Sequence, residues 1–102
     1  MKTLVFLESA TADLDSIYTF IAKNSGDTTP ALRFIEEIDS KCRALASLPF
    51  PMGRPRPDIR YDLRGYTHIS YIILFRYVDD NFEVVNVLHG SRDLESYYDE
   101  DA

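Results

Sequence analysis

The chain is poor in the residues that build the commonest catalytic and metal sites. It contains one cysteine, two histidines and no tryptophan among its 102 residues. Because Cys42 is alone, no internal disulfide can form. His68 and His89 lie 21 positions apart, and neither has a cysteine or second histidine at helical spacing beside it. The sequence therefore predicts no metal site and no cofactor.

Glycine is also scarce, and no long hydrophobic run is present. Gly53 and Gly65 are isolated from each other, so no phosphate-binding loop is predicted, and no serine-elbow motif occurs. No run is long enough to cross a membrane. The apolar residues 4–7 are too few for a signal peptide, and acidic Glu8 follows them. We expect a cytoplasmic protein, a compartment that also suits a lone reduced cysteine.

Positive charge is in the minority and is concentrated in one region. The formal net charge is −6, which argues against a surface devoted as a whole to nucleic acid. Residues 50–76 nevertheless carry a net charge of +3, which leaves −9 for the remainder. The arginines of this region are Arg54, Arg56, Arg60, Arg64 and Arg76. Either they pair with surface carboxylates or they form a binding face for an acidic partner.

The strongest structural pattern is a β-hairpin near the end of the chain. Residues 71–78 and a second run that starts at residue 82 are rich in β-branched and aromatic residues, and a polar turn separates them. Both runs are nearly continuous in apolar residues, which is typical of central strands. Residues 3–7 and 59–63 predict two further strands, and Gly65 allows a turn after the second of these.

Two helices are predicted between the first strand and the basic region, because apolar residues recur there at three- and four-residue spacing. Ser9 or Thr11 is the expected cap of the first helix, and Gly26 its expected end. Thr28 or Thr29 is the expected cap of the second helix, with Pro30 at its first helical position. Its apolar stripe includes Cys42, so we expect a buried, reduced thiol.

These elements predict one α+β domain over residues 1–102, in the order β-α-α-β-β-β. The sheet is expected to be mostly antiparallel, with the N-terminal helical hairpin packed on one face and a short C-terminal helical turn after residue 91. The short link between the helices favours their antiparallel arrangement. The first strand can join the sheet at an edge or between later strands, and its spacing does not decide which.

Basic and aromatic side chains near the predicted strand ends are the candidate functional residues. They are Arg64, Arg76, His89 and Arg92, with Tyr97 and Tyr98 beyond them. Neighbouring strand ends can gather on one rim, where arginine forks bind phosphate or carboxylate. In RNA cleavage His89 would act as acid or base, while Arg64 and Arg92 would stabilise charge. A single histidine does not supply both the acid and the base that this reaction needs. The alternative is that His89 has a structural role.

The order and spacing of several short motifs resemble the RelE/ParE toxin superfamily of bacterial type II toxin–antitoxin modules, and the ParE branch more closely. The matching motifs are Ala12-Asp13-Leu14, Met52-Gly53-Arg54, Leu63-Arg64, Phe75-Arg76-Tyr77 and Val87-Leu88-His89-Gly90-Ser91-Arg92-Asp93. The resemblance implies a toxin that a cognate antitoxin neutralises. ParE-like toxins act on DNA gyrase and are not nucleases, whereas RelE-like toxins cleave messenger RNA in the ribosome.

The lysines that RelE-like toxins use have no counterparts here, because no lysine follows Lys41. The resemblance therefore implies a non-enzymatic gyrase inhibitor. A ribosome-dependent endoribonuclease that uses His89, Arg64 and Arg92 is the first alternative, and a non-toxic binding module on the same fold is the second.

A disordered, acidic and apolar antitoxin segment can fold onto a helical hairpin and a sheet edge. The predicted partner-binding residues are Arg54, Arg56, Arg60, Arg64, Arg76, Arg92 and Tyr98. Apolar residues on the sheet face away from the helices would be further partner surface. We expect neither membrane binding nor direct sequence-specific DNA binding.

Overall fold

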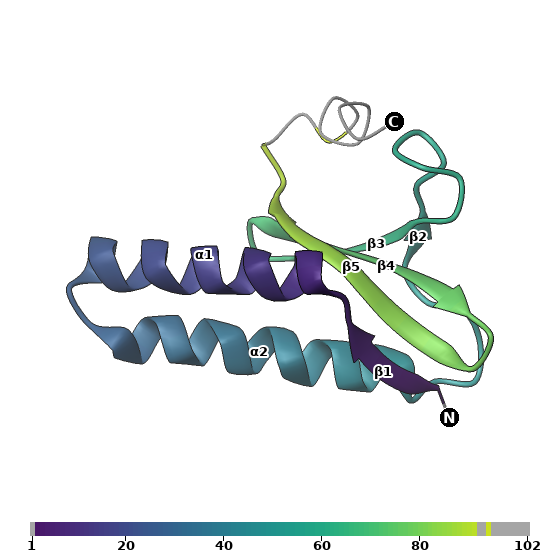
Figure 1. Ribbon diagram of the computed structural model, residues 1–102, viewed down its shortest axis with the longest axis horizontal. Coiled ribbons are helices and arrows are strands. Elements are labelled where there is room, and N and C mark those ends of the chain that lie inside the picture. Colours follow the sequence, from purple (N-terminus) through teal and green to yellow (C-terminus); the bar gives the residue numbers. More distant parts are fainter. Residues whose placement is uncertain (1, 92–93, 95–102) are drawn as a thin grey trace.

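A computed structural model describes residues 2–91 and 94, which form a helical hairpin beside a five-stranded sheet (Figure 1). The elements are β1 (Thr3–Phe6), α1 (Glu8–Ser25), α2 (Thr28–Ala46), β2 (Arg54–Pro55), β3 (Arg64–His68), β4 (Tyr71–Val78) and β5 (Asn81–His89). The strand order is β1-β5-β4-β3-β2, and β1 runs parallel to β5 while the other pairs are antiparallel. This confirms the α+β fold and the central β4–β5 hairpin, and it places the first strand at an edge.

The helix ends differ from the predicted caps at two of three positions. Gly26 ends α1 as expected, with φ of 70° and its N–H donating to the carbonyl of Ala22. At the start of α1, Leu7 is the N-cap and no side chain caps the helix, so the predicted cap at Ser9 or Thr11 is wrong. The Ser9 hydroxyl instead donates to the backbone carbonyl of Val85 on β5.

The second helix begins at Thr28, two residues before the predicted first helical residue, so the predicted cap at Thr28 or Thr29 is wrong. Asp27 is its N-cap, and the Asp27 carboxylate accepts a hydrogen bond of 3.0 Å from the N–H of Thr29. This bond holds the pKa of Asp27 below its usual range. Pro30 is therefore the third helical residue, where its missing N–H is still one of the unpaired groups of the first turn.

The larger core lies between the two helices and one face of the sheet. Its fully buried side chains include Ile38 from α2, Phe75 from β4 and Phe82 from β5. The rings of Phe75 and Phe82 stack with their centroids 4.4 Å apart. Cys42 is buried in the same core, and this burial raises the pKa of its thiol to about 12. The prediction that Cys42 is buried is confirmed.

The opposite face of the sheet is covered as well, by the loop between β2 and β3. Ile59 and Leu63 of this loop pack on apolar side chains of β4 and β5. The covered residues are Ile72, Leu74, Val85 and Leu88. The prediction that this face exposes apolar residues is therefore wrong.

The segment 59–63 that builds this cover is turn rather than the predicted strand. Local backbone bonds replace ladder bonds there, since the N–H of Ile59 donates to the carbonyl of Arg56 at 3.0 Å and that of Leu63 to Arg60 at 3.1 Å. Strand β3 begins at Arg64, directly after the segment predicted as a strand. Gly65 therefore lies inside β3 and not in a turn. A Cβ at Gly65 would lie 2.9 Å from Cδ1 of Ile72, so glycine permits the close packing of this strand.

A β-bulge in β5 explains its nearly continuous apolar run. Leu74 pairs with Asn86 and Phe75 with Val84, so Val85 is an extra residue on β5. Val84 consequently faces the helices while Val85 faces the loop.

Beyond the end of β1, side chains of α1 form hydrogen bonds to the edge of β5 that β1 does not cover. The Asp13 carboxylate accepts from the N–H of Val87 at 3.0 Å and from the side-chain amide of Asn86 at 2.8 Å. Ser9 and Asp13 are four residues apart, so both face β5 from one side of the helix. Their contacts fix the final part of β5, which leads to His89.

Candidate partner-binding site

The arginines of the basic region do not share one rim. Arg64 is directly opposite Phe75 in the β3–β4 ladder, so both side chains lie on the helix side of the sheet. Arg76 follows Phe75 in β4 and therefore points to the other face. The prediction that the arginines at these strand ends gather on one rim is wrong, because the alternation of the strand separates them.

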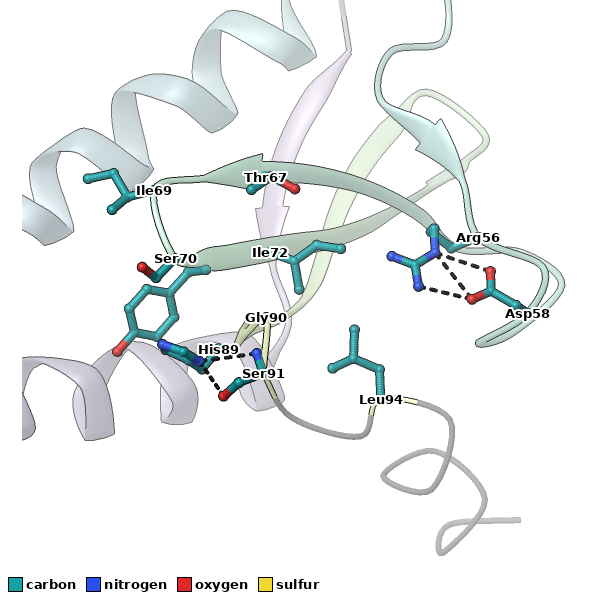
Figure 2. Close-up of a pocket in the computed structure, with 11 residues that line it drawn as sticks. Arg56, Asp58, Thr67, Ile69, Ser70, Ile72, His89, Gly90, Ser91 and Leu94 are labelled. Carbon is teal, nitrogen blue, oxygen red and sulfur yellow. Dashed lines mark hydrogen bonds and ion pairs between the residues drawn. The ribbon is translucent and has the colours of Figure 1, made fainter.

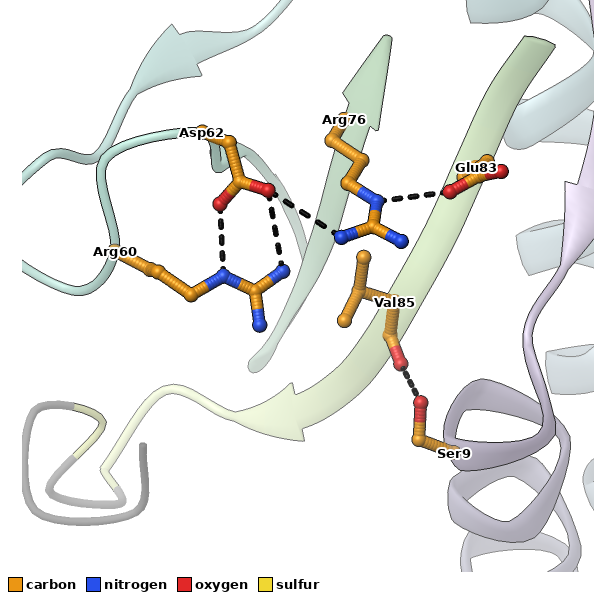
Figure 3. A network of polar contacts seen from close by, with 6 residues as sticks. All are labelled: Ser9, Arg60, Asp62, Arg76, Glu83 and Val85. Atoms are coloured by element: carbon orange, nitrogen blue, oxygen red, sulfur yellow. Dashed lines mark hydrogen bonds and ion pairs between the residues drawn. The ribbon is translucent and has the colours of Figure 1, made fainter. Parts of the chain in front are cut away.

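On the loop side of the sheet, two arginines and two carboxylates form a continuous network (Figure 3). Arg60 Nε donates to Asp62 Oδ1 at 2.7 Å, and Arg76 Nη1 donates to Asp62 Oδ2 at 3.3 Å. Arg76 Nε also donates to Glu83 Oε1 at 2.8 Å. Two positive and two negative charges thus balance, which leaves little net charge here for an acidic partner.

The pKa values in this network follow from its geometry. Partial burial disfavours the charged form of Asp62, but the hydrogen bond from Arg60 and the charge of its guanidinium outweigh this effect. The pKa of Asp62 is therefore lowered. The hydrogen bond to Glu83 raises the pKa of Arg76, although partial burial opposes it.

Arg56 is also paired, with a carboxylate two residues along the chain. Its Nη2 and Nε donate to Asp58 Oδ2 at 2.9 Å and 3.3 Å, which lowers the pKa of Asp58. Of the two alternatives for the basic region, pairing with surface carboxylates is therefore correct for Arg56, Arg60 and Arg76.

Arg54 and Arg64 differ, since within residues 2–91 and 94 neither forms an ion pair with a carboxylate. Arg64 Nε donates to the carbonyl of Met52 at 2.6 Å, and Nη2 donates to that of Gly53 at 3.3 Å. Gly53 has φ of 72°, and a Cβ there would lie 2.7 Å from the Phe75 ring. Arg64 therefore fixes a tight backbone turn that leads into β2, where Arg54 is exposed.

His89 is the last residue of β5 and pairs with Tyr71, the first residue of β4. Its ring packs edge to face on Tyr71 at 5.2 Å, and the backbone N–H of Ser91 donates to Nδ1 at 3.1 Å. Nδ1 therefore accepts a hydrogen bond in this arrangement. His68 pairs with Tyr71 from the other side, in β3, and its Nε2 is 3.2 Å from Oε1 of Glu37 in α2.

His89 borders a hollow of about 580 Å³ at this end of the sheet (Figure 2). The β3–β4 turn forms one wall, and Arg56 with Asp58 forms another. Ile72 and Leu94 also line it. The hollow brings together residues from three separate parts of the chain.

Comparison with protein-family models identifies the family of this chain. The sequence model described as ParE toxin of type II toxin-antitoxin system, parDE, matches residues 4–94. The chain belongs to the ParE toxin family. A solved structure described as the chromosomal ParDE TA system from P. aeruginosa shares the fold with a TM-score of 0.77 and 23% identity, covering 87% of this chain and 96% of that chain. No curated protein sequence matches.

Two of the predicted residues of this ParE-family toxin, Arg92 and Tyr98, lie outside the described residues, as do Tyr97 and most of the predicted C-terminal helical turn. No helix in the described part of the chain is long and apolar enough to cross a membrane. In that part, no group of three His, Cys, Asp or Glu side chains is placed to hold a metal ion.

The sequence analysis of this toxin missed the hollow and the two turn residues beside it, Ile69 and Ser70. No charge, motif or periodicity marks these two positions. Their arrangement arises from the pairing of β3, β4 and β5, which a single sequence does not reveal.

Proposed function

We propose that this ParE-family toxin inhibits DNA gyrase by binding to it as a protein, and that it does not cleave RNA. Its family membership supports the proposal, because the ParE-like branch it resembles acts on gyrase. The absence of lysine after residue 41 also supports it, since RelE-like cleavage relies on several lysines.

The observation that carries the proposal is the separation of the two residues that a nuclease would need together. His89 pairs with Tyr71 and Arg64 with Phe75, so they lie at positions four residues apart along β4. At about 3.3 Å per residue this is roughly 13 Å along the strand direction. The two residues are also on different strands, β5 and β3, on either side of β4. The Arg64 guanidinium is also bonded to the carbonyls of Met52 and Gly53. This arrangement does not favour contact of both side chains with one phosphate, whereas a general acid or base must be within hydrogen-bond reach.

The test is a supercoiling assay with purified toxin and gyrase. We expect the wild-type chain to inhibit supercoiling and His89→Ala to inhibit it equally. Codon-specific cleavage of messenger RNA on ribosomes, abolished by His89→Ala in a folded protein, would instead establish the endoribonuclease alternative.

We further propose that a cognate antitoxin binds beside β2. Arg54 is exposed there, and two large side chains nearby in sequence, Phe50 and Tyr61, are 59% and 89% exposed. An acidic and apolar segment matches this combination of charge and exposed rings. Because β2 has two residues and one is Pro55, its edge is a poor template for an added strand. Contact through side chains, as from a helix, suits it better.

A charge reversal tests this surface. Arg54→Glu should weaken antitoxin binding at least tenfold and make the remaining affinity less dependent on salt. Arg33→Glu on α2 is the matched control, because it makes the same change on another exposed arginine. Equal losses in both variants would show a general charge effect and contradict a site at β2.

A further inference from the structure

The turn between β3 and β4 contains a residue that fits its backbone poorly. Ile69 has φ of 56°, in the left-handed region that β-branched side chains rarely adopt. Among the described residues, Asp79 in the β4–β5 turn is the other non-glycine with positive φ, at 54°. Aspartate is tolerated in this region because its short polar side chain bonds locally, whereas isoleucine has no such compensation.

Packing does not explain the strained residue either. The Ile69 side chain is 73% exposed, so it contributes little to either core. Glycine or asparagine would form the same turn with less strain. A strained, solvent-exposed apolar side chain at the tip of a turn points to a role outside the folding of this chain.

The turn is held rigidly at the rim of the hollow. The N–H of Gly90 donates to the carbonyl of Ser70 at 2.8 Å, and His68 and Tyr71 form the ladder pair that closes the turn. Figure 2 shows Ile69 and Ser70 at the end of this hairpin, with His89 and Gly90 beside them. Ile69 is thus presented on a fixed support and not on a free loop.

The charges around the turn favour a protein as the occupant. His68 contacts Glu37, and the Arg56 guanidinium across the hollow is paired with Asp58. The Nδ1 of His89 accepts from Ser91. Each of these three groups therefore has at least one partner within the chain, which makes the surface a poorer match for phosphates than a set of unpaired cations would be. An apolar side chain with paired polar neighbours resembles the centre and rim of a protein interface.

We propose that Ile69 is the apolar anchor of the surface that meets the toxin's target, and that it inserts into an apolar pocket on that folded protein. The hollow beside it receives a side chain of the same partner. This inference rests on the proposed function in that it assumes a protein target. The antitoxin segment and a second copy of the toxin are the other possible occupants.

The test uses the whole chain and relies on two opposite effects of one substitution. Ile69→Asn should raise Tm by a few degrees, because asparagine relieves the strain. The same variant should lose at least tenfold in gyrase inhibition and in growth inhibition after induction without antitoxin. Ile69→Val keeps the apolar, β-branched side chain and should retain activity. Asp79→Asn, at the equivalent strained position of the other turn, should leave activity unchanged.

The outcomes separate this inference from the proposed function. If wild-type toxin inhibits gyrase and Ile69→Asn does so equally, the inference fails alone. If the toxin stops growth without affecting gyrase and Ile69→Asn abolishes that effect, the gyrase proposal fails and the anchor stands. A loss of antitoxin binding or of self-association with toxicity intact would assign Ile69 to those partners and overturn the inference. A wild-type chain that affects neither gyrase nor growth overturns both.

Discussion

The two faces of the sheet are covered in different ways. On one face, α1 and α2 bury aromatic and aliphatic side chains such as Phe75 and Phe82 in the larger core. On the other face, a loop without regular structure covers a smaller cluster with Ile59 and Leu63. The loop face also carries the network of Arg60, Asp62, Arg76 and Glu83, which has no equivalent of that size among the ion pairs of the described residues.

This difference separates the part of the toxin that holds the fold from the part that can vary for binding. The helix face gains its stability from buried apolar area, which is the dominant favourable term in folding. The loop face is held by fewer apolar contacts and by partly exposed ion pairs, which are individually weak. We therefore expect substitutions to cost more stability on the helix face than on the loop face.

The largest effect should follow from Phe75→Ala, at the centre of the helix face. Phe75 is fully buried and stacks on Phe82, so its loss should lower the free energy of unfolding by about 3–5 kcal/mol. Chemical denaturation followed by circular dichroism would measure this loss. Phe20→Ala is the control, since Phe20 is largely exposed on α1. Similar losses for the two variants would contradict the helix-face core described above.

Leu63→Ala makes the same kind of change on the loop face. Leu63 is fully buried, but it lies in a loop that can collapse onto the space left behind. We expect a loss of about 2–3 kcal/mol, near the lower end for such substitutions. Tyr61→Ala, in the same loop and almost fully exposed, should cost little. A loss for Leu63→Ala as large as that for Phe75→Ala would remove the distinction between the two faces.

The helix face was largely predictable from the sequence, because its signals are periodic. The apolar spacing of α1 and α2 and the β-branched runs of β4 and β5 each repeat over many residues. The loop face was not predictable in the same way. In residues 59–63 the alternation of polar and apolar side chains fits a strand. In the loop, however, Ile59 and Leu63 turn inward while Tyr61, which a strand would place on their side, is 89% exposed.

The candidate site was predicted less well, since it depends on pairing between distant segments. The excess of arginine in residues 50–76 was visible, but the partners of Arg76 come from Asp62 in the loop and Glu83 in β5. Which face Arg64 occupies follows from the register of β3, and that register is set by the turn at Ile69 and Ser70. No local property of the sequence reports it.

Asp13→Ala tests the edge of the sheet, where the two faces meet. The substitution leaves the N–H of Val87 without its acceptor and removes the partner of the Asn86 amide, which should cost about 1–3 kcal/mol. Asp13→Asn keeps an acceptor oxygen and should cost less. Asp15→Ala, on an exposed face of the same helix, is the matched control. Amide hydrogen exchange should show faster exchange at Val87 in Asp13→Ala, and unchanged exchange there would mean that Asp13 does not protect the edge.

The smallest effect is expected for Asp62→Asn, which removes the central carboxylate of the loop-face network. At neutral pH the loss should be about 1 kcal/mol or less, because the ion pairs are partly exposed. The pKa of Asp62 is lowered in the folded protein, so its stabilising effect is present above the unfolded-state pKa of about 3.9 and is lost as the pH falls through the folded-state value. The difference in unfolding free energy between wild type and Asp62→Asn should therefore have its full size at pH 7 and shrink as the pH falls below about 4. Urea titrations across this range would measure it, with Asp80→Asn in the exposed β4–β5 turn as the control. A difference that stays constant with pH would show that the carboxylate acts through its shape and hydrogen bonds and not through its charge, and the loop face would then owe its stability to packing as the helix face does.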